Sequence, residues 1–271
     1  MTFAETQRAH SGDRRISSVF WVLLAVLATS GWAVWSGYGG DPGVGVFLFV
    51  ISGWMVSLCL HEYGHARTAL HGGDITVGAK GYLTLNPLKY TNVVFSFVLP
   101  VVFVVLGGIG LPGGAVYIER HRIRGRLKHS LISAAGPLVN VAFAAVLLVF
   151  VGAGWFEGRQ SHSYQDGFLL HSAMSGALAY LAMFQVSAAL LNLLPVPGLD
   201  GYGILEPWLS PQARRAVEPF APYGMLAVFA LLWQPQVNRI FFDVVYGVTG
   251  LFGVGPDYIA TGDYLFRFWS H

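Results

Sequence analysis

The chain has 271 residues, of which 54% are hydrophobic and only 11% are charged, and its formal net charge is +2. Ordinary soluble domains carry about 25% charged residues, so this composition excludes a soluble globular protein and predicts a polytopic membrane protein. A single cysteine, Cys59, excludes an intrachain disulfide, and no nucleic-acid partner is expected.

Two apolar segments follow a polar arm at the start of the chain. Residues 1–15 are polar and include several arginines, which predicts a short cytoplasmic arm. Residues 17–37 and 44–70 are each long enough to cross a hydrocarbon core of about 30 Å. A tight turn separates them, so the second segment returns toward the side on which the first began.

The next stretch is predicted not to cross the membrane. Residues 71–90 mix glycines with short β-branched and aromatic pieces, which predicts a small β-hairpin or an irregular loop. Residues 93–111 are apolar but interrupted by proline and glycine, and residues 119–129 hold five basic side chains. Because a short basic loop belongs on the cytoplasmic side, residues 93–111 are predicted to be re-entrant or to lie along the membrane.

Further apolar regions complete the chain. Residues 130–151 and 168–194 predict a third and a fourth span, separated by an outer loop. Residues 220–252 contain Pro235 and several polar side chains, which leaves open one kinked span or two short ones. The prediction is an all-α polytopic membrane protein with about five or six transmembrane helices and a small membrane-associated β-hairpin. These form one domain over residues 16–252, and an interfacial tail follows at residues 253–271.

The second span carries the pattern His-Glu-x-x-His, at His61, Glu62 and His65. Positions i and i+4 share one face of a helix, so the imidazoles of His61 and His65 can bind a single metal ion. Glu62 is offset by one position and can reach a water instead of the metal. Zinc hydrolases use this arrangement of two His ligands and a carboxylate base. The alternative is polar pairing between helices, since such side chains in lipid need partners or a wet cavity.

A catalytic zinc ion has three protein ligands and one open position, so a third ligand is needed. Asp200 is the best candidate, because it follows a Pro-x-Pro-Gly turn on the same side of the membrane as His65. Taken alone, such a residue is more often a loop carboxylate at a membrane surface. The rival candidates are Asp74, His71, Glu119, Glu206 and Asp243.

Asn140 and Asn192 are neutral amides inside the third and fourth spans. An amide can donate a hydrogen bond to a developing oxyanion, or it can hold a substrate backbone in place. The alternative for each is a structural hydrogen bond between helices, typically worth about 1 kcal/mol.

Three motifs occur in the order of a known family. The stretches His61-Glu-Tyr-Gly-His65, Ala135-Gly-Pro-Leu-Val-Asn140 and Asn192-Leu-Leu-Pro-Val-Pro-Gly-Leu-Asp200-Gly resemble the signatures of the site-2 protease family of intramembrane zinc metalloproteases. The resemblance covers about residues 44–205 and implies a helical bundle with one zinc ion per chain, below the cytoplasmic membrane surface. It implies His61, His65 and Asp200 as zinc ligands and Glu62 as the general base. Asn140 and Asn192 would then contact the oxyanion or the substrate.

Residues 110–117 also resemble the membrane-embedded β-hairpin of this family. The edge of that hairpin, which would include Gly113 and Gly114, is expected to bind the substrate as an added β-strand. No stretch is long and polar enough for a PDZ domain or a paired CBS domain, so a minimal member of the family is expected.

The residues and the resemblance together predict a multi-pass protein of the cell membrane with a cytoplasmic N-terminus. Its expected activity is hydrolysis of peptide bonds in transmembrane segments of membrane-anchored regulatory proteins. The expected partners are therefore a transmembrane-helix protein substrate and the lipid bilayer. The alternatives are a zinc transporter and a catalytically silent relative that binds transmembrane helices. The sequence does not specify the oligomeric state.

Overall fold

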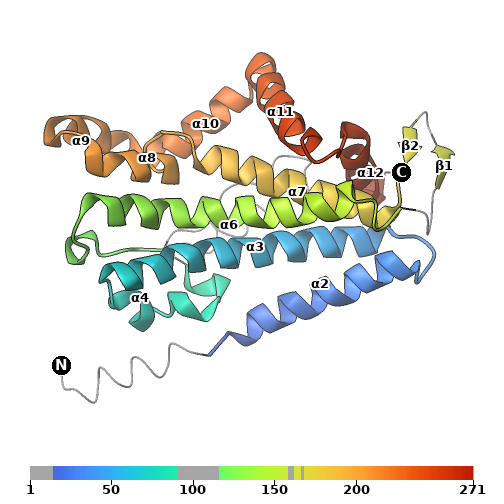
Figure 1. The fold of residues 1–271 in the computed structure, drawn as a ribbon, viewed down its shortest axis with the longest axis horizontal. Helices are drawn as coiled ribbons and strands as arrows, with labels where there is room; N and C mark the ends of the chain where they lie inside the picture. Colours follow the sequence, from blue (N-terminus) through green and yellow to red (C-terminus); the bar gives the residue numbers. More distant parts are fainter. Residues whose placement is uncertain (1–14, 91–115, 158–161, 166–167, 271) are drawn as a thin grey trace.

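A computed structural model describes residues 15–90, 116–157, 162–165 and 168–270. Four long helices form its body: α2 (Ser18–Ser36), α3 (Gly43–Gly72), α6 (Arg126–Gly152) and α7 (Ala173–Asn192). In Figure 1, α3, α6 and α7 lie side by side, and α2 packs against α3. The helix α7 lies deepest, since Leu181 and Phe184 in its middle are completely buried.

These four helices confirm the predicted spans. Each is long and apolar enough to cross a membrane, and so is the run Pro211–Leu232, so the described part of the chain is a mainly helical integral membrane protein. The helix α7 begins five residues later than the predicted residue 168, at Ala173. The reason is a cap: the Ser172 hydroxyl accepts a hydrogen bond from the Ser175 amide at 3.1 Å, which fixes the start of the helix.

The region after α7 contains one candidate span and a separate, shorter helix where the sequence left one or two spans open. The run Pro211–Leu232 consists of α9 (Pro211–Val217), η6 (Glu218–Tyr223) and α10 (Gly224–Leu232). A separate helix, α11 (Pro235–Gly250), follows after a break. Pro235 has no amide hydrogen to continue α10 and takes the first position of α11 instead.

For residues 71–90 the sequence left a β-hairpin or an irregular loop open, and the β-hairpin is wrong. The chain forms three short helices there, α4 (Thr76–Ala79), η1 (Tyr82–Thr84) and η2 (Pro87–Lys89). Val77 and Leu83 are buried against Ala66 and Ala69 of α3, so tertiary packing overrides the local strand preference.

The strands of the described residues lie elsewhere. They are β1 (His162–Gln165) and β2 (Phe168–Leu170), an antiparallel pair in the predicted outer loop, with His162 opposite Leu170 and Gln165 opposite Phe168. Most of the hairpin predicted for residues 110–117 lies outside the described residues, and so do Gly113, Gly114, the predicted re-entrant segment 93–111 and nearly all of the cytoplasmic arm.

The predicted interfacial tail is largely helical and packs into the bundle. It holds α12 (Pro256–Phe266) and η7 (Phe268–Ser270). The side chains of Ile259 and Phe266 join the core around α7. The Tyr180 hydroxyl of α7 donates to Asp263 of α12 at 2.8 Å, so the two helices are tied by a polar contact as well.

One end of the bundle carries the C-terminal end of α3, the basic loop and α8 (Asp200–Leu205). The Lys80 ammonium lies 3.2 Å from the Glu119 carboxylate, and Arg120 pairs with Glu206 just after α8. The Tyr90 hydroxyl donates to the Cys59 carbonyl at 3.2 Å, and the Val116 amide donates to Glu62 at 3.1 Å. Both flanks of residues 91–115 therefore lie at this end, as the charge argument predicts for them.

Candidate active site

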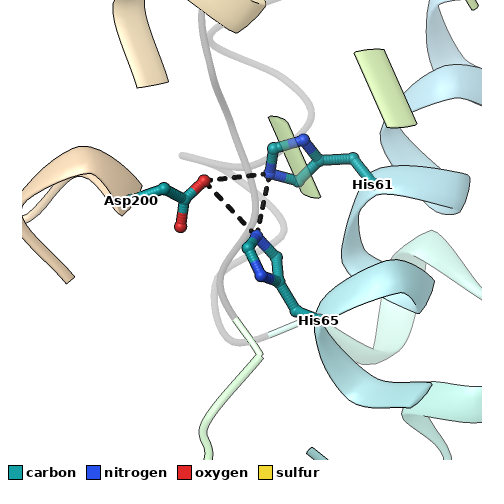
Figure 2. Close-up of side chains that lie close together, drawn as sticks. All are labelled: His61, His65 and Asp200. Carbon is teal, nitrogen blue, oxygen red and sulfur yellow. Dashed lines mark hydrogen bonds and ion pairs between the residues drawn. The ribbon is translucent and has the colours of Figure 1, made fainter. Parts of the chain in front are cut away.

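The two histidines of the motif lie on one face of α3 and point the same way. Their Nε2 atoms are 3.1 Å apart, and both side chains are buried. Figure 2 shows the imidazoles converging on the carboxylate of Asp200, which comes from a different segment of the chain. The i, i+4 spacing predicted this shared face.

Asp200 reaches the histidines from the first residue of α8. Its Oδ2 lies 3.3 Å from the Nε2 of His61 and 3.3 Å from the Nε2 of His65. The helix α7 ends at Asn192, and the chain turns back through Gly198, whose φ of +91° favours glycine. The carbonyl of Ala221 also leaves no room there, because a Cβ on Gly198 would lie 2.5 Å from its oxygen.

The rival carboxylates are engaged elsewhere. Asp74 accepts hydrogen bonds from Thr76 and from the Glu119 amide, and Glu206 pairs with Arg120. The group His61, His65 and Asp200 is the set of His, Cys, Asp and Glu side chains in the described chain whose ligand atoms converge closely enough for a metal ion. The structure therefore brings together the three residues that the sequence selected.

The spacing of the three donor atoms fits tetrahedral zinc. With metal–ligand bonds of about 2.0–2.1 Å, two ligand atoms of a tetrahedral ion lie about 3.3–3.4 Å apart. The observed separations are 3.1, 3.3 and 3.3 Å. Gly136 of α6 leaves the necessary space, since a Cβ there would lie 2.2 Å from the Nε2 of His65 and 2.5 Å from that of His61. The donor set and the space beside it both fit a bound zinc ion.

The second nitrogen of each imidazole is held by an oxygen atom. The Nδ1 of His65 donates to the Ile132 carbonyl at 2.7 Å, and the Nδ1 of His61 lies 2.5 Å from the Oδ1 of Asn140. A ring that donates from Nδ1 has its lone pair on Nε2, which is the tautomer a metal requires. Both rings thus present a free Nε2 toward Asp200.

This arrangement gives Asn140 contacts that the sequence did not predict. Its Oδ1 faces His61, and its Nδ2 donates to the Oε1 of Gln185 at 2.8 Å. Asn140 is therefore placed to orient a metal ligand, and the bond to Gln185 uses one of the two hydrogens on its Nδ2. The residue was found from the sequence, but its role depends on a partner on α7 that sequence spacing does not reveal.

Glu62 lies next to the metal ligands and is almost completely buried, with 2% of its surface exposed. Its Oε2 accepts a hydrogen bond from the Val116 amide at 3.1 Å. Glu62 lines the same cavity as His61 and His65. One carboxylate oxygen is therefore fixed by the backbone of residue 116, in a cavity shared with the proposed metal.

The cavity has a volume of about 880 Å³ and extends on both sides of the three ligands. Trp54 and Ser57 line its deep end, and Arg214 and Glu218 line it near the end of the bundle that carries α9. Asn192 also lines it, and its side-chain amide has no hydrogen-bond partner within the described part of the chain. Asn192 thus differs from Asn140, whose side chain contacts His61 and Gln185.

Two contributors to the site were missed from the sequence. Gly136 provides space for the ligands, and its position four residues before Asn140, on the same helix face, was the available signal. The carbonyl of Ile132 orients His65, and a backbone group leaves no signal in the sequence.

Neighbouring cations keep one carboxylate of the basic loop ionised. Hydrogen bonds from Arg122 and Lys80 lower the pKa of Glu119 to about 2. The loop that follows Val116 is therefore tied by an ionised Glu119 throughout the neutral pH range.

Comparison with known proteins agrees with this geometry. The model of peptidase family M50 matches residues 49–233, which include all three ligands and Glu62. Several relatives carry the name "putative zinc metalloprotease", and two of them illustrate the range. Rip2 of Mycolicibacterium smegmatis is 45% identical over 261 residues, covering 94% of this chain and 95% of the relative. YwhC of Bacillus subtilis is 30% identical over 195 residues, covering 70% of this chain and 83% of the relative.

No solved structure matches the chain. The family model and the nearly full-length relatives, together with the His-Glu-x-x-His helix, show that the chain belongs to peptidase family M50, the site-2 protease family.

Proposed function

We propose that this protein is a zinc endopeptidase that hydrolyses peptide bonds within transmembrane segments of membrane-anchored proteins, with regulatory proteins as the natural substrates. The observation that carries the proposal is the convergence of His61 and His65 with Asp200 beside a buried Glu62. The helix that holds the two histidines and Glu62 is long enough to span a membrane. A metalloprotease needs this donor set, a nearby base and an open position for the substrate.

The residues divide the chemistry between them. His61, His65 and Asp200 would hold one zinc ion, which when bound supplies a Lewis acid that makes water a nucleophile near neutral pH. Glu62 would take the proton from the attacking water and pass it to the leaving amine. The Val116 amide keeps the Glu62 carboxylate oriented toward the cavity during both transfers.

A helical substrate must unwind locally, because its carbonyl groups are hydrogen-bonded inside the helix. Val116 and Ile118 line the cavity beside Glu62 in a segment without helix or strand, and this segment is our candidate docking edge for the unwound chain. The free amide of Asn192 would donate to a substrate carbonyl. Gly113 and Gly114, which lie outside the described residues, remain part of the proposed edge.

The depth of the site supports cleavage within the membrane. His61 is eighteen residues after the start of α3, which corresponds to about 27 Å along the helix axis. A hydrocarbon core is about 30 Å thick, so the site would lie just below one surface. We place that surface on the cytoplasmic side of the cell membrane, together with the N-terminus, because the basic loop lies at the same end of the bundle.

The test uses the purified full-length protein, reconstituted in liposomes with a panel of single-span membrane peptides. We expect one zinc ion per chain, and cleavage that stops when zinc is removed and returns when zinc is restored. Mass spectrometry of the products would locate the cut, which must fall inside the apolar segment of a peptide. Zinc binding without cleavage of any peptide would instead favour the silent relative, and zinc movement across the liposome would favour a transporter.

The first prediction concerns the base. Glu62→Gln should keep zinc bound but lower the cleavage rate by about 10²–10⁴-fold, because the nearly isosteric amide cannot accept the proton. Zinc content and initial rates measured on the same preparation separate the two effects. Glu157→Gln, the same change at the opposite end of the bundle, is the matched control and should cleave normally. A Glu62→Gln variant as fast as the wild type would remove Glu62 from its proposed role.

A further inference from the structure

A chain of polar side chains runs through the apolar centre of the bundle, behind the metal ligands. It joins Ser57 of α3, Asn140 of α6 and Gln185 of α7, whose exposed fractions are 1%, 3% and 0%. The Ser57 hydroxyl donates to the Oε1 of Gln185 at 2.7 Å, and the Nδ2 of Asn140 donates to the same oxygen at 2.8 Å. The other end of Asn140 faces His61. Buried polar side chains in a membrane helix are costly, so this chain requires an explanation.

The direction of the hydrogen bonds decides whether His61 can bind a metal. With the Oε1 of Gln185 facing Asn140, the Asn140 amide hydrogens point to Gln185 and its Oδ1 points to His61. The Nδ1 of His61 must then carry the hydrogen, and its Nε2 is free for the metal. If Gln185 offered its NH₂ group instead, Asn140 would turn over, and Nδ1 of His61 would become the acceptor. The hydrogen would then sit on Nε2 and block the metal position.

The buried amide nitrogen of Gln185 is energetically unfavourable for the fold. Its Nε2 is buried and has no hydrogen-bond partner among the described residues. A buried unpaired amide typically costs about 1–3 kcal/mol, so simple helix packing would be better served by an apolar side chain. The acceptor oxygen, which receives two hydrogen bonds, is the part of Gln185 that the arrangement uses.

We propose that Gln185 is a positioning residue of the metal centre: it orients Asn140, and through Asn140 it fixes the tautomer of His61 that can bind zinc. The inference rests on the metal centre proposed above but not on cleavage of any substrate. Its test is therefore metal binding by the zinc-free full-length protein, measured by competition with a chelator and by the absorption spectrum of bound cobalt.

The central variant is Gln185→Leu, which removes the acceptor at similar volume. We expect zinc affinity to fall about tenfold, the lower end of the range for loss of an outer-shell partner, and the cobalt spectrum to change. Gln185→Glu keeps an acceptor oxygen facing Asn140 and Ser57, and it should restore most of the affinity. The matched control is Ser187→Ala, two residues along α7. It removes a buried hydroxyl that has no hydrogen-bond partner in the described chain.

A double-mutant cycle separates positioning from packing. Asn140→Ala should lower zinc affinity about 10–100-fold. Because Gln185 acts through Asn140, adding Gln185→Leu to Asn140→Ala should change the affinity less than about twofold. Independent, additive effects of the two substitutions would overturn the proposal, as would equal zinc affinities for the wild type and Gln185→Leu. A wild type that binds no zinc would instead overturn the proposed function.

Discussion

At the scale of single residues, the metal site depends on Gly136, which has no side chain, as much as on the three ligands. Gly136 lies on α6 opposite the two imidazoles, at a distance that any side chain would fill. The atoms that a Cβ would meet are the ends of His61 and His65, which can rotate, and not a rigid backbone. A larger residue at this position would therefore displace the ligands while leaving the helices in place.

Gly136→Ala is predicted to lower zinc affinity by more than about 100-fold, beyond the loss expected for an outer-shell partner. The folded protein should survive, since alanine is favoured over glycine in a helix by about 1 kcal/mol. Zinc content and thermal unfolding of the zinc-free protein measure the two effects separately. Gly247→Ala on α11, where a Cβ would meet nothing within 4 Å, is the matched control. Normal zinc affinity in Gly136→Ala would show that the ligands do not need this space.

The ligands themselves could be predicted from the sequence, but their supports could not. The spacing of His61 and His65 and the turn before Asp200 are local features. Such features can be recognised in a single sequence. The role of Asn140 depends on Gln185, which is 45 residues away on another helix. Only the packing of α6 against α7 brings these two amides together, so no single-sequence pattern distinguishes an orienting amide from an oxyanion donor.

At the scale of elements, the long apolar helices were predictable and the short ones were not. A transmembrane helix is specified by length and composition, so α2, α3 and α6 begin and end close to the predicted residues. The short helices at residues 76–89 have no such length, and their conformation is set by burial of Val77 and Leu83 against α3. Burial against a neighbouring helix also explains α12, whose eleven residues the sequence analysis assigned to an interfacial tail.

The contact between α12 and α7 is a close approach of backbones. A Cβ on Gly262 would lie 2.2 Å from the Gly176 carbonyl oxygen and 2.5 Å from the Cβ of Tyr180. Small residues let membrane helices approach in this way, and the gain is van der Waals contact and not exclusion of water. The position of α12 is therefore sensitive to one methyl group.

Gly262→Ala is predicted to destabilise the protein by about 1–3 kcal/mol, because overpacking forces α12 away from α7. Thermal unfolding in detergent, followed by circular dichroism, measures the change. Gly250→Ala on α11 adds the same methyl group in open space and should leave the midpoint unchanged or raise it slightly, because alanine is favoured over glycine in a helix. An unchanged midpoint in Gly262→Ala would mean that α12 is not docked as described.

At the scale of the whole molecule, the bundle has two unlike ends. The end that carries the metal ligands also carries the basic loop, whose ion pairs join α4 to α8 through Glu119 and Arg120. The opposite end carries the turn between α2 and α3 and the strands β1 and β2. The sequence predicted this asymmetry from charge alone, because the basic side chains of residues 119–129 are expected on the cytoplasmic side of the membrane.

The last prediction concerns orientation, and it tests this asymmetry directly. Arg124→Cys places an exposed thiol in the basic loop, and Tyr38→Cys places one in the turn at the opposite end, where Tyr38 is 72% exposed. Each is made in a Cys59→Ala background, although Cys59 is itself buried. An impermeant maleimide added to intact cells should label the Tyr38→Cys protein and spare the Arg124→Cys protein. The pattern should reverse in inverted vesicles. If Arg124→Cys were labelled from outside, the metal site would open on the external face, and cytoplasmic cleavage of the substrate would be impossible.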